Sequence, residues 1–418
     1  MRLGATTVFY GLEVCTRIPT WVVMAVYLVR ELNLSPLELL LMGTAMEAAV
    51  FLFEIPTGVV ADTYSRRLSL VIGYLGMGTA WMTVGLVSTP WAVILLWAGW
   101  GFAYTFTSGA YQAWITDEVG AENVRALFLR GRRIGYAGAV AGLVVQVVVA
   151  TASLRAGVIV GGAATALCGL ACIFVMPETG FRRRSRSERG PAFHELRFTA
   201  TRAARFAWTA PILLVLVAVE LFMGMSSEAF DRLKEAHFLR DVGLPAVGDL
   251  DAVVWFGILW LVGMIIGFVA LGPLIKAVES RGREVVSRFL LCFTLLELAA
   301  MLAFALSRSA WPAIAGLLAV FFARDLQGPL YTTWINEQIT DSTVRATVLS
   351  ISGQANAIGQ AGGGPALGAI GNAWGIRAAL VAGAAAIAPA LALYGRAIRN
   401  DGREPELVDL HQPVETGA

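Results

Sequence analysis

The chain has 418 residues, of which 57% are hydrophobic and only 15% are charged, with a formal net charge of +2. A soluble domain carries about 25% charged residues, so this composition excludes an ordinary soluble protein and predicts one that crosses a membrane many times. The four cysteines all lie in apolar runs, which argues against a disulfide framework or a metal site: Cys15, Cys168, Cys172 and Cys292.

Twelve apolar runs follow one another, each near the roughly 20 residues that cross hydrocarbon as a helix. The predicted spans of the first half are Thr7–Val29, Leu39–Ala61, Leu68–Val87, Trp91–Thr116, Ile134–Ser153 and Gly157–Met176. Those of the second half are Pro211–Phe230, Val253–Ile275, Val285–Leu306, Trp311–Ile335, Thr347–Ile370 and Ala378–Tyr394. We expect an all-α membrane protein of twelve transmembrane helices, with six-helix bundles in residues 1–176 and 210–399, a cytoplasmic linker in 177–209 and a disordered tail in 400–418.

The basic residues are distributed unevenly between the two sets of loops. With both termini in the cytoplasm, the inner segments hold 23 Lys and Arg residues and the outer segments hold seven. Cytoplasmic loops carry the excess of positive charge, so the distribution supports this orientation. The basic linker is expected to lie on anionic lipid headgroups and not on nucleic acid.

The turn between the second and third spans combines opposite charges at a helix end. It has the sequence Gly58-x-x-x-Asp62-x-x-Ser65-Arg66-Arg67. The Asp62 carboxylate lies at the negative, C-terminal end of its own helix, so it needs Arg66 one turn away or the positive start of another helix. This spacing and position resemble the loop signature of the major facilitator superfamily of secondary transporters, which usually has Gly where this chain has Ser65.

The resemblance implies how the turn would gate a carrier. We expect Asp62 to face the start of span eleven near Val344, and Arg66 to face one of the two acids that end span four. These contacts would hold the inner ends of the two halves together in the outward-open state. The residues assigned to this gate are Gly58, Asp62, Arg66, Arg67, Asp117, Glu118 and Arg345.

The two halves of the chain repeat one another. The pattern Tyr-x-x-Trp-Ile starts at Tyr111 and recurs at Tyr331, 220 residues later, so span four corresponds to span ten. Two parallel six-helix pseudo-repeats are what the superfamily shows. In that family, spans one, four, seven and ten line a central cavity.

Ionisable side chains within the spans are costly in hydrocarbon and usually face a cavity or a partner. Side chains from Tyr10 to Trp21 recur at steps of three or four residues, so they share one face of span one. A simpler alternative makes Glu13 and Arg17 a static ion pair that holds the bundle together. By resemblance, the cavity-lining candidates are Tyr10, Glu13, Arg17, Trp21, Tyr104, Ser108, Tyr111, Gln112, Arg324, Tyr331 and Gln354.

No histidine lies in a predicted span, so proton exchange would fall to carboxylates, whose protonation responds to desolvation. Glu13 and Asp325 each have an arginine close in sequence, and we expect Glu13–Arg17 and Arg324–Asp325 to form a polar cluster that shapes the site. Span seven carries two acids without a basic neighbour on their inner side. The proton-carrier candidates are therefore Glu220 or Glu228, with Asp325 and Glu47 as alternatives, while Glu54 is assigned to the turn's network and Glu297 to a structural role.

Three short stretches narrow the resemblance: Glu54-Ile-Pro-Thr-Gly58, Trp114-Ile-Thr-Asp-Glu118 and Val344-Arg-Ala346. They are similar to those of bacterial drug:proton antiporters of the macrolide and tetracycline efflux type. The run from Gly359 to Gly368 looks like the Gly-Pro motif of such antiporters, although that motif normally belongs to span five. The resemblance implies proton-coupled export of bulky, amphiphilic, cationic compounds across a bacterial cytoplasmic membrane.

The sequence leaves other functions open. An importer of a small metabolite is the main alternative, followed by a proton-coupled lipid exporter and, more distantly, a non-transporting receptor. No Ser-His-Asp arrangement, metal-ligand spacing or phosphate-binding loop occurs in the sequence, so we expect neither an enzyme nor an ATP-driven pump. We expect no cofactor; the expected partners of this monomer are a small-molecule substrate, protons and membrane lipids.

Overall fold

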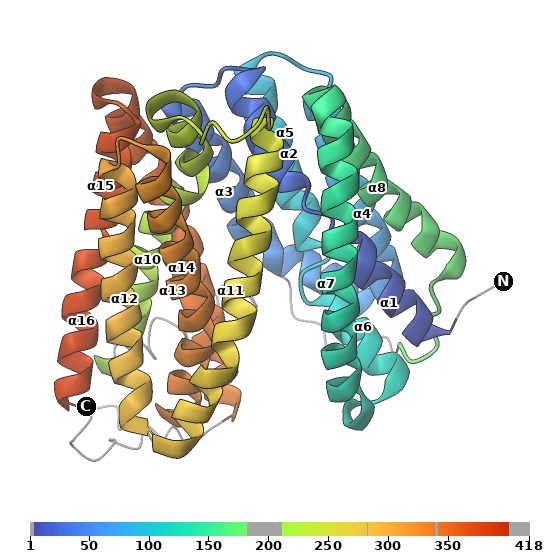
Figure 1. The fold of residues 1–418 in the computed structure, drawn as a ribbon. Coiled ribbons are helices and arrows are strands. Elements are labelled where there is room, and N and C mark those ends of the chain that lie inside the picture. Colours follow the sequence, from blue (N-terminus) through green and yellow to red (C-terminus); the bar gives the residue numbers. More distant parts are fainter. Residues whose placement is uncertain (1–3, 182–210, 282, 339–341, 401–418) are drawn as a thin grey trace, which may run out of the picture.

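The computed structural model describes residues 4–181, 211–281, 283–338 and 342–400, and these residues form a bundle of long helices (Figure 1). The first half forms α1 (Ala5–Cys15), α2 (Thr20–Arg30), α3 (Pro36–Thr63), α4 (Arg66–Val84), α5 (Pro90–Thr105), α6 (Ala110–Val119), α7 (Ala121–Ala152) and α8 (Leu154–Val175). The second half forms α10 (Pro211–His237), the π-helical turn η2 (Phe238–Val242), α11 (Ala252–Arg281), α12 (Arg283–Leu306), α13 (Ala310–Gln338), α14 (Ser342–Trp374), α15 (Ile376–Ala385) and α16 (Ile387–Asn400).

These helices make up the twelve predicted spans. The pairs α1 with α2, α5 with α6, and α15 with α16 each form one interrupted span, and every other α-helix forms one span by itself. Among the described residues, eight spans are long and apolar enough to cross a membrane on length and composition alone. The prediction of an all-α membrane protein with twelve transmembrane helices is confirmed.

Two spans of the first half are interrupted where continuous helices were predicted. Span one breaks between Cys15 and Thr20, where Pro19 lacks a backbone N–H and Thr16 donates its hydroxyl to the Leu12 carbonyl, 2.7 Å away. Span four breaks between Thr105 and Ala110, where Gly109 has φ of 72°, a conformation that a residue with a Cβ rarely adopts. The prediction of unbroken spans there was wrong, because α1 ends at Cys15 and α5 ends at Thr105.

The helix ends follow the usual capping chemistry. Ser35 precedes α3 and accepts a hydrogen bond from the Glu38 amide at 3.3 Å, while the Glu38 carboxylate accepts one from the Ser35 amide at 2.7 Å. Pro36 occupies the first helical position, where its missing N–H costs nothing. The helix α7 begins at Ala121, well before the predicted Ile134, because the predicted span covered only the apolar part of this helix.

The two halves meet along α3 and α14. The run of small residues in α14 lies against α3: a Cβ on Gly364 would be 2.1 Å from Thr44 Oγ1, and one on Gly368 would be 2.9 Å from Leu37 Cα. Small residues let helices approach closely, so this run serves packing between the halves. Thr44 also donates a hydrogen bond to the Ala361 carbonyl at 3.3 Å.

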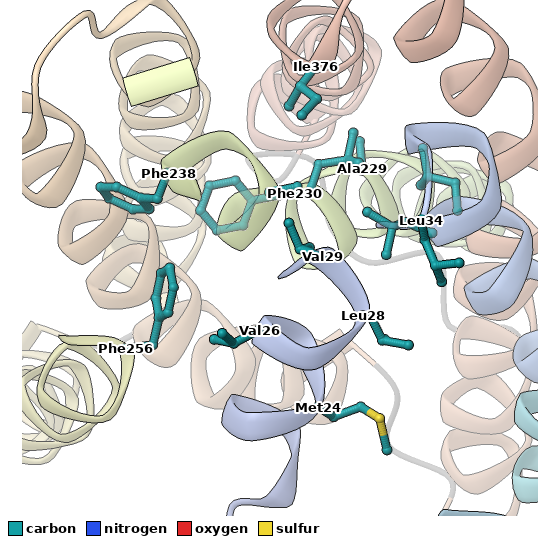
Figure 2. Close-up of a cluster of buried hydrophobic side chains, with 14 of the residues drawn as sticks. Met24, Val26, Leu28, Val29, Leu34, Ala229, Phe230, Phe238, Phe256 and Ile376 are labelled. Carbon is teal, nitrogen blue, oxygen red and sulfur yellow. The ribbon is translucent and has the colours of Figure 1, made fainter. Parts of the chain in front are cut away.

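The halves are also joined at one end of the bundle, formed by residues 30–36, 238–252 and 371–376, which we call the contact end. Arg240 donates hydrogen bonds to the Leu34 carbonyl at 2.9 Å, to Asn33 Oδ1 at 3.0 Å and to the Val29 carbonyl at 3.3 Å. An apolar cluster supports this junction. Figure 2 shows side chains of α2 beside those of the second half in this cluster, whose labelled members are Met24, Val26, Leu28, Val29, Leu34, Ala229, Phe230, Phe238, Phe256 and Ile376.

Candidate functional site

A cavity of about 1030 Å³ lies between the two halves. Its lining comes from helices of both halves, chiefly from the first and fourth spans, α7, α10, α11 and α13. Six of the eleven predicted cavity-lining residues line it, and so does the proton-carrier candidate Asp325: Arg17, Trp21, Tyr104, Ser108, Tyr111 and Gln112. The other five predicted lining residues do not occur among its described lining residues: Tyr10, Glu13, Arg324, Tyr331 and Gln354.

Both helix breaks of the first half lie at this cavity. Residues Thr16 to Pro19 line it at the break of span one, and residues Thr107 to Gly109 line it at the break of span four. Interrupted transmembrane helices expose backbone polar groups where a cavity can use them. The sequence signals for these breaks were Pro19 and Gly109, which apolar span patterns do not take into account.

One wall of the cavity is aromatic. The Trp21 ring is 39% exposed, and its centroid lies 5.1 Å from each of the centroids of Trp81, Trp97 and Trp100. Trp100 in turn stacks on Tyr104 at 5.4 Å with an interplanar angle of 10°. Large rigid rings supply much contact area to a ligand at low entropic cost. Trp81, Trp97 and Trp100 were not among the predicted cavity residues, although their positions inside spans, away from the membrane interface, could have indicated them.

Glu13 and Arg17 form an ion pair at 2.8 Å beside the break of span one. The Tyr111 hydroxyl donates to the other Glu13 oxygen at 3.1 Å, which links span one to span four. On α7, a Cβ at Gly135 would lie 2.4 Å from Arg17 Nε, so this glycine makes room for the pair. Glu13 is therefore buried behind Arg17, and only Arg17 and Tyr111 line the cavity.

The expected Arg324–Asp325 pair does not form. Arg324 binds Glu297 at 2.6 Å and Asp231 at 2.9 Å. Adjacent residues on a helix do not share a face, so Arg324 points into its own bundle while Asp325 points into the cavity. Glu297 is 1% exposed and also accepts a hydrogen bond from Gln327 at 2.9 Å.

The two acids of α10 have different surroundings. Glu228 is 1% exposed and pairs with Arg232 at 3.1 Å, and its other oxygen has no hydrogen-bond partner among the described residues. Arg232 lines the cavity, and its guanidinium lies 5.1 Å from the centroid of the Trp97 ring. Glu220 instead accepts a hydrogen bond from Asn356 at 2.9 Å, within the second half.

The first half approaches this pair closely through α3. A Cβ on Gly43 would lie 1.6 Å from Glu228 Oε1 and 2.5 Å from Arg232 Nε. Glu47, one turn further along α3, lies within the electrostatic reach of Arg232. The pair thus sits at the boundary between the halves, where a movement of one half past the other would change its surroundings.

Glu54 also connects the halves, which the sequence analysis did not predict. It accepts hydrogen bonds from Ser108 at 2.9 Å and from Gln354 of α14 at 3.5 Å. Its assignment to the network of the charged turn was therefore wrong. The reason is its position on α3, where it faces the break of span four, two helical turns before the charged end.

The charged turn lies where predicted, at the junction of α3 and α4. Arg66 binds Asp117 at 2.8 Å and Asp62 at 3.3 Å, so the acid that faces Arg66 is Asp117. Glu118 accepts hydrogen bonds from the amides of Thr179 and Gly180. The side chains near Val344, including Arg345, lie outside the described residues.

One residue of this network was missed. Glu178 accepts a hydrogen bond from the Ser65 hydroxyl at 2.7 Å and another from the Arg67 amide at 3.0 Å, so it caps α4 from 111 residues away. The Arg67 guanidinium bonds to the Ile173 carbonyl. The start of the segment that joins the halves is thereby fixed to the turn.

Two parallel bundles around a shared cavity define a multi-pass membrane carrier. The chain belongs to the Major Facilitator Superfamily, whose profile matches residues 6–343. An uncharacterized transporter of this type from Bacillus subtilis (strain 168), YxaM, is 21% identical over 383 residues, or 90% of each chain. A second, MJ1317 from Methanocaldococcus jannaschii, is 32% identical over 77 residues, which cover 18% of this chain and 19% of that one.

Solved structures show the same fold at low identity. The nucleoside transporter NupG (D323A mutant) aligns with a TM-score of 0.76 at 13% identity, covering 94% of this chain and 98% of that one. A POT family transporter in complex with 5-aminolevulinic acid aligns with a TM-score of 0.71 at 11% identity, covering 94% and 95%. The protein is thus a membrane transporter of the superfamily, whose members are generally carriers without enzymatic activity.

Proposed function

We propose that the protein exports bulky amphiphilic compounds in exchange for protons by alternating access. The observation that supports this most is the composition of the cavity, with an aromatic wall on the first half and ionisable groups from both halves. About 1030 Å³ is at the upper end of the volumes of small-molecule sites, which suits a large substrate. Aromatic faces attract both apolar rings and cations, so an amphiphile with a basic group fits this wall.

The arrangement of the halves supports loading from the cytoplasm. They are tied together at the contact end, and the cavity extends from Leu28 and Val29 near that end to Gln112 and Arg132 toward the opposite end. If the excess of basic residues marks the cytoplasmic side, the contact end faces outward. An exporter takes up its substrate in this state. The ion pairs of Arg66 with Asp62 and Asp117 are already formed in it, and closure of the cytoplasmic side would bring Asp62 to the start of span eleven in the outward-open state.

We assign the transported proton to the acids of α10. Glu228 is the first candidate and Glu220 is the second. When Glu228 takes up a proton, its attraction for Arg232 is lost, and Arg232 is freed toward the cavity beside Trp97. When the proton leaves, the ion pair forms again. Because the pair lies against Gly43 of the other half, this exchange would be coupled to the movement of the halves.

The test compares two modes of transport in proteoliposomes. A variant that cannot carry a proton, such as Glu228→Gln, should lose transport driven by a proton gradient but keep exchange of labelled substrate across the membrane. Glu279→Gln, which removes an exposed carboxylate of α11, is the matched control and should keep both. If Glu228→Gln and Glu220→Gln both keep full proton-driven transport, the assignment of the proton to α10 is wrong.

The same proteoliposomes test the direction of transport. Under a proton gradient, an exporter lowers the amount of compound on the cytoplasmic side, whereas an importer of a small metabolite raises it. Proton-driven accumulation on the cytoplasmic side would refute export. The absence of any exchange would favour a receptor.

A further inference from the structure

Most charges at the cavity are neutralised by a partner from their own half. Arg17 pairs with Glu13 across the end of α1, and Arg232 pairs with Glu228 one turn along α10, each pair four residues apart in sequence. Lys234 lies 3.4 Å from Glu235 and also near Asp231. Among the described residues, the charged cavity groups outside these pairs are Arg132 and Asp325.

Asp325 presents an unpaired carboxylate to the cavity from α13. It is exposed, and among the described residues no basic side chain forms an ion pair with it. A Cβ on Gly267 of α11 would lie 2.1 Å from Asp325 Oδ2, so the carboxylate occupies space that this glycine leaves open. The neighbouring helix thereby fixes where the negative charge stands.

Arg132, on α7 in the other half, forms no ion pair with any residue that the structure describes. Its Nε donates a hydrogen bond to the Tyr136 hydroxyl at 3.2 Å, and its guanidinium lies 5.9 Å from the centroid of the Tyr136 ring. A guanidinium has five N–H donors, so four stay available for a ligand. Arg132 is also the basic residue whose charge acts on Asp325 through space, which places both at the same part of the cavity.

We propose that these two side chains bind the substrate as a zwitterion, with its basic group on Asp325, its acidic group on Arg132 and its ring system on Trp21. The inference rests on the proposed function and narrows its substrate class to amphiphiles that carry both charges. Since the two side chains belong to opposite halves, such a ligand bridges the halves. A ligand with a positive charge alone lacks the ionic contact with Arg132 and touches the first half through Trp21 only.

Two dyes with one aromatic skeleton test this inference. Rhodamine B carries a carboxylate beside its cationic ring system, and its ethyl ester carries the positive charge alone. Exchange of each dye across proteoliposomes of the full chain is measured over a range of concentrations. The wild type should reach half-maximal exchange at a concentration of rhodamine B about tenfold below that of the ester, as expected for one added charge-assisted contact.

Variants assign the discrimination to its residues. Arg132→Gln should abolish the preference for rhodamine B over the ester, whereas Arg133→Gln, an exposed neighbour outside the cavity lining, should keep it. Asp325→Asn should raise the concentration needed for half-maximal exchange to a similar extent for both dyes. Gly267→Ala should do the same, because it displaces the carboxylate without removing its charge.

The outcomes separate the inference from the proposed function. If the wild type exchanges both dyes without preference, the zwitterion site is contradicted but the proposed function is not. The same holds if the preference for rhodamine B survives Arg132→Gln. Exchange of neither dye contradicts the proposed function, and the zwitterion site with it.

Discussion

The ion pair of Glu228 and Arg232 gives a stability prediction that is independent of transport. The two side chains are 1% and 12% exposed, so Glu228→Gln would leave a buried guanidinium without its carboxylate. Removing one partner of a buried pair costs roughly 3–5 kcal/mol, and the glutamine oxygen can still accept a hydrogen bond. We therefore expect a loss of roughly 2–3 kcal/mol in the free energy of unfolding.

A double-mutant cycle in detergent micelles measures this loss by denaturant unfolding. Arg232→Met combined with Glu228→Gln should recover most of the loss, because an apolar side chain suits the contact with Met46 and Trp97. The coupling energy should be about 1.5–3 kcal/mol. If the losses in the free energy of unfolding of the two single variants add up in the double variant, a buried ion pair is refuted. A Glu228→Gln variant as stable as the wild type would refute it as well.

A glycine variant tests the same contact from the other half. Gly43→Ala should destabilise the protein, because its Cβ would lie 1.6 Å from Glu228 Oε1. Gly353→Ala, which meets open space in α14, is the matched control and should have little effect or a small stabilising one.

Three further changes test the ends of the bundle. Arg240→Ala removes three hydrogen bonds across the contact end and should shift the halves apart there, which distance measurements between spin labels on the two halves would detect. Asp62→Asn should leave the protein folded but lower its turnover, and unchanged transport rates would contradict the gating role. Glu178→Ala should lower the free energy of unfolding by about 1 kcal/mol, because α4 loses a cap, and an unchanged stability would show that the cap contributes nothing.

The sequence was a good guide wherever a contact is local. Twelve spans follow from hydropathy because hydrocarbon demands about 20 apolar residues for each crossing. The Glu13–Arg17 pair follows from a spacing of four residues within one span, and it forms although α1 ends between them at Cys15. The charged turn was found because its residues are adjacent in sequence and its end of the helix requires a counter-charge.

The sequence was a poor guide wherever partners are distant. Arg324 binds acids 27 and 93 residues away, and neither separation leaves a pattern in a single sequence. The expectation that Arg324 pairs with Asp325 relied on adjacency, which on a helix points two side chains in different directions. This error matters because Asp325 lines the cavity, and no basic side chain among the described residues forms an ion pair with it.

The break of span four suggests that the cavity depends on one backbone conformation. Gly109 has φ of 72°, and a Cβ placed there would meet nothing within 4 Å, so Gly109→Ala tests the backbone without a clash. An alanine with φ of 72° and ψ of −39° is strained by roughly 1–3 kcal/mol, which favours a straighter helix. Straightening would move Ser108 away from Glu54, 2.9 Å from it, and Tyr111 away from Glu13.

We therefore expect Gly109→Ala to fold but to bind and exchange substrate less well, by roughly ten- to hundredfold if the full strain opposes the bound conformation. The measurement is substrate exchange in proteoliposomes together with tryptophan fluorescence. Trp100 lies on the same span as the break and stacks on Tyr104, so a change of the backbone there would change its surroundings. Gly11→Ala in α1, which also meets open space but has no positive φ, is the control. Equal effects of the two alanines would show that the break is incidental. A loss confined to Gly109→Ala would show that its backbone conformation maintains the cavity.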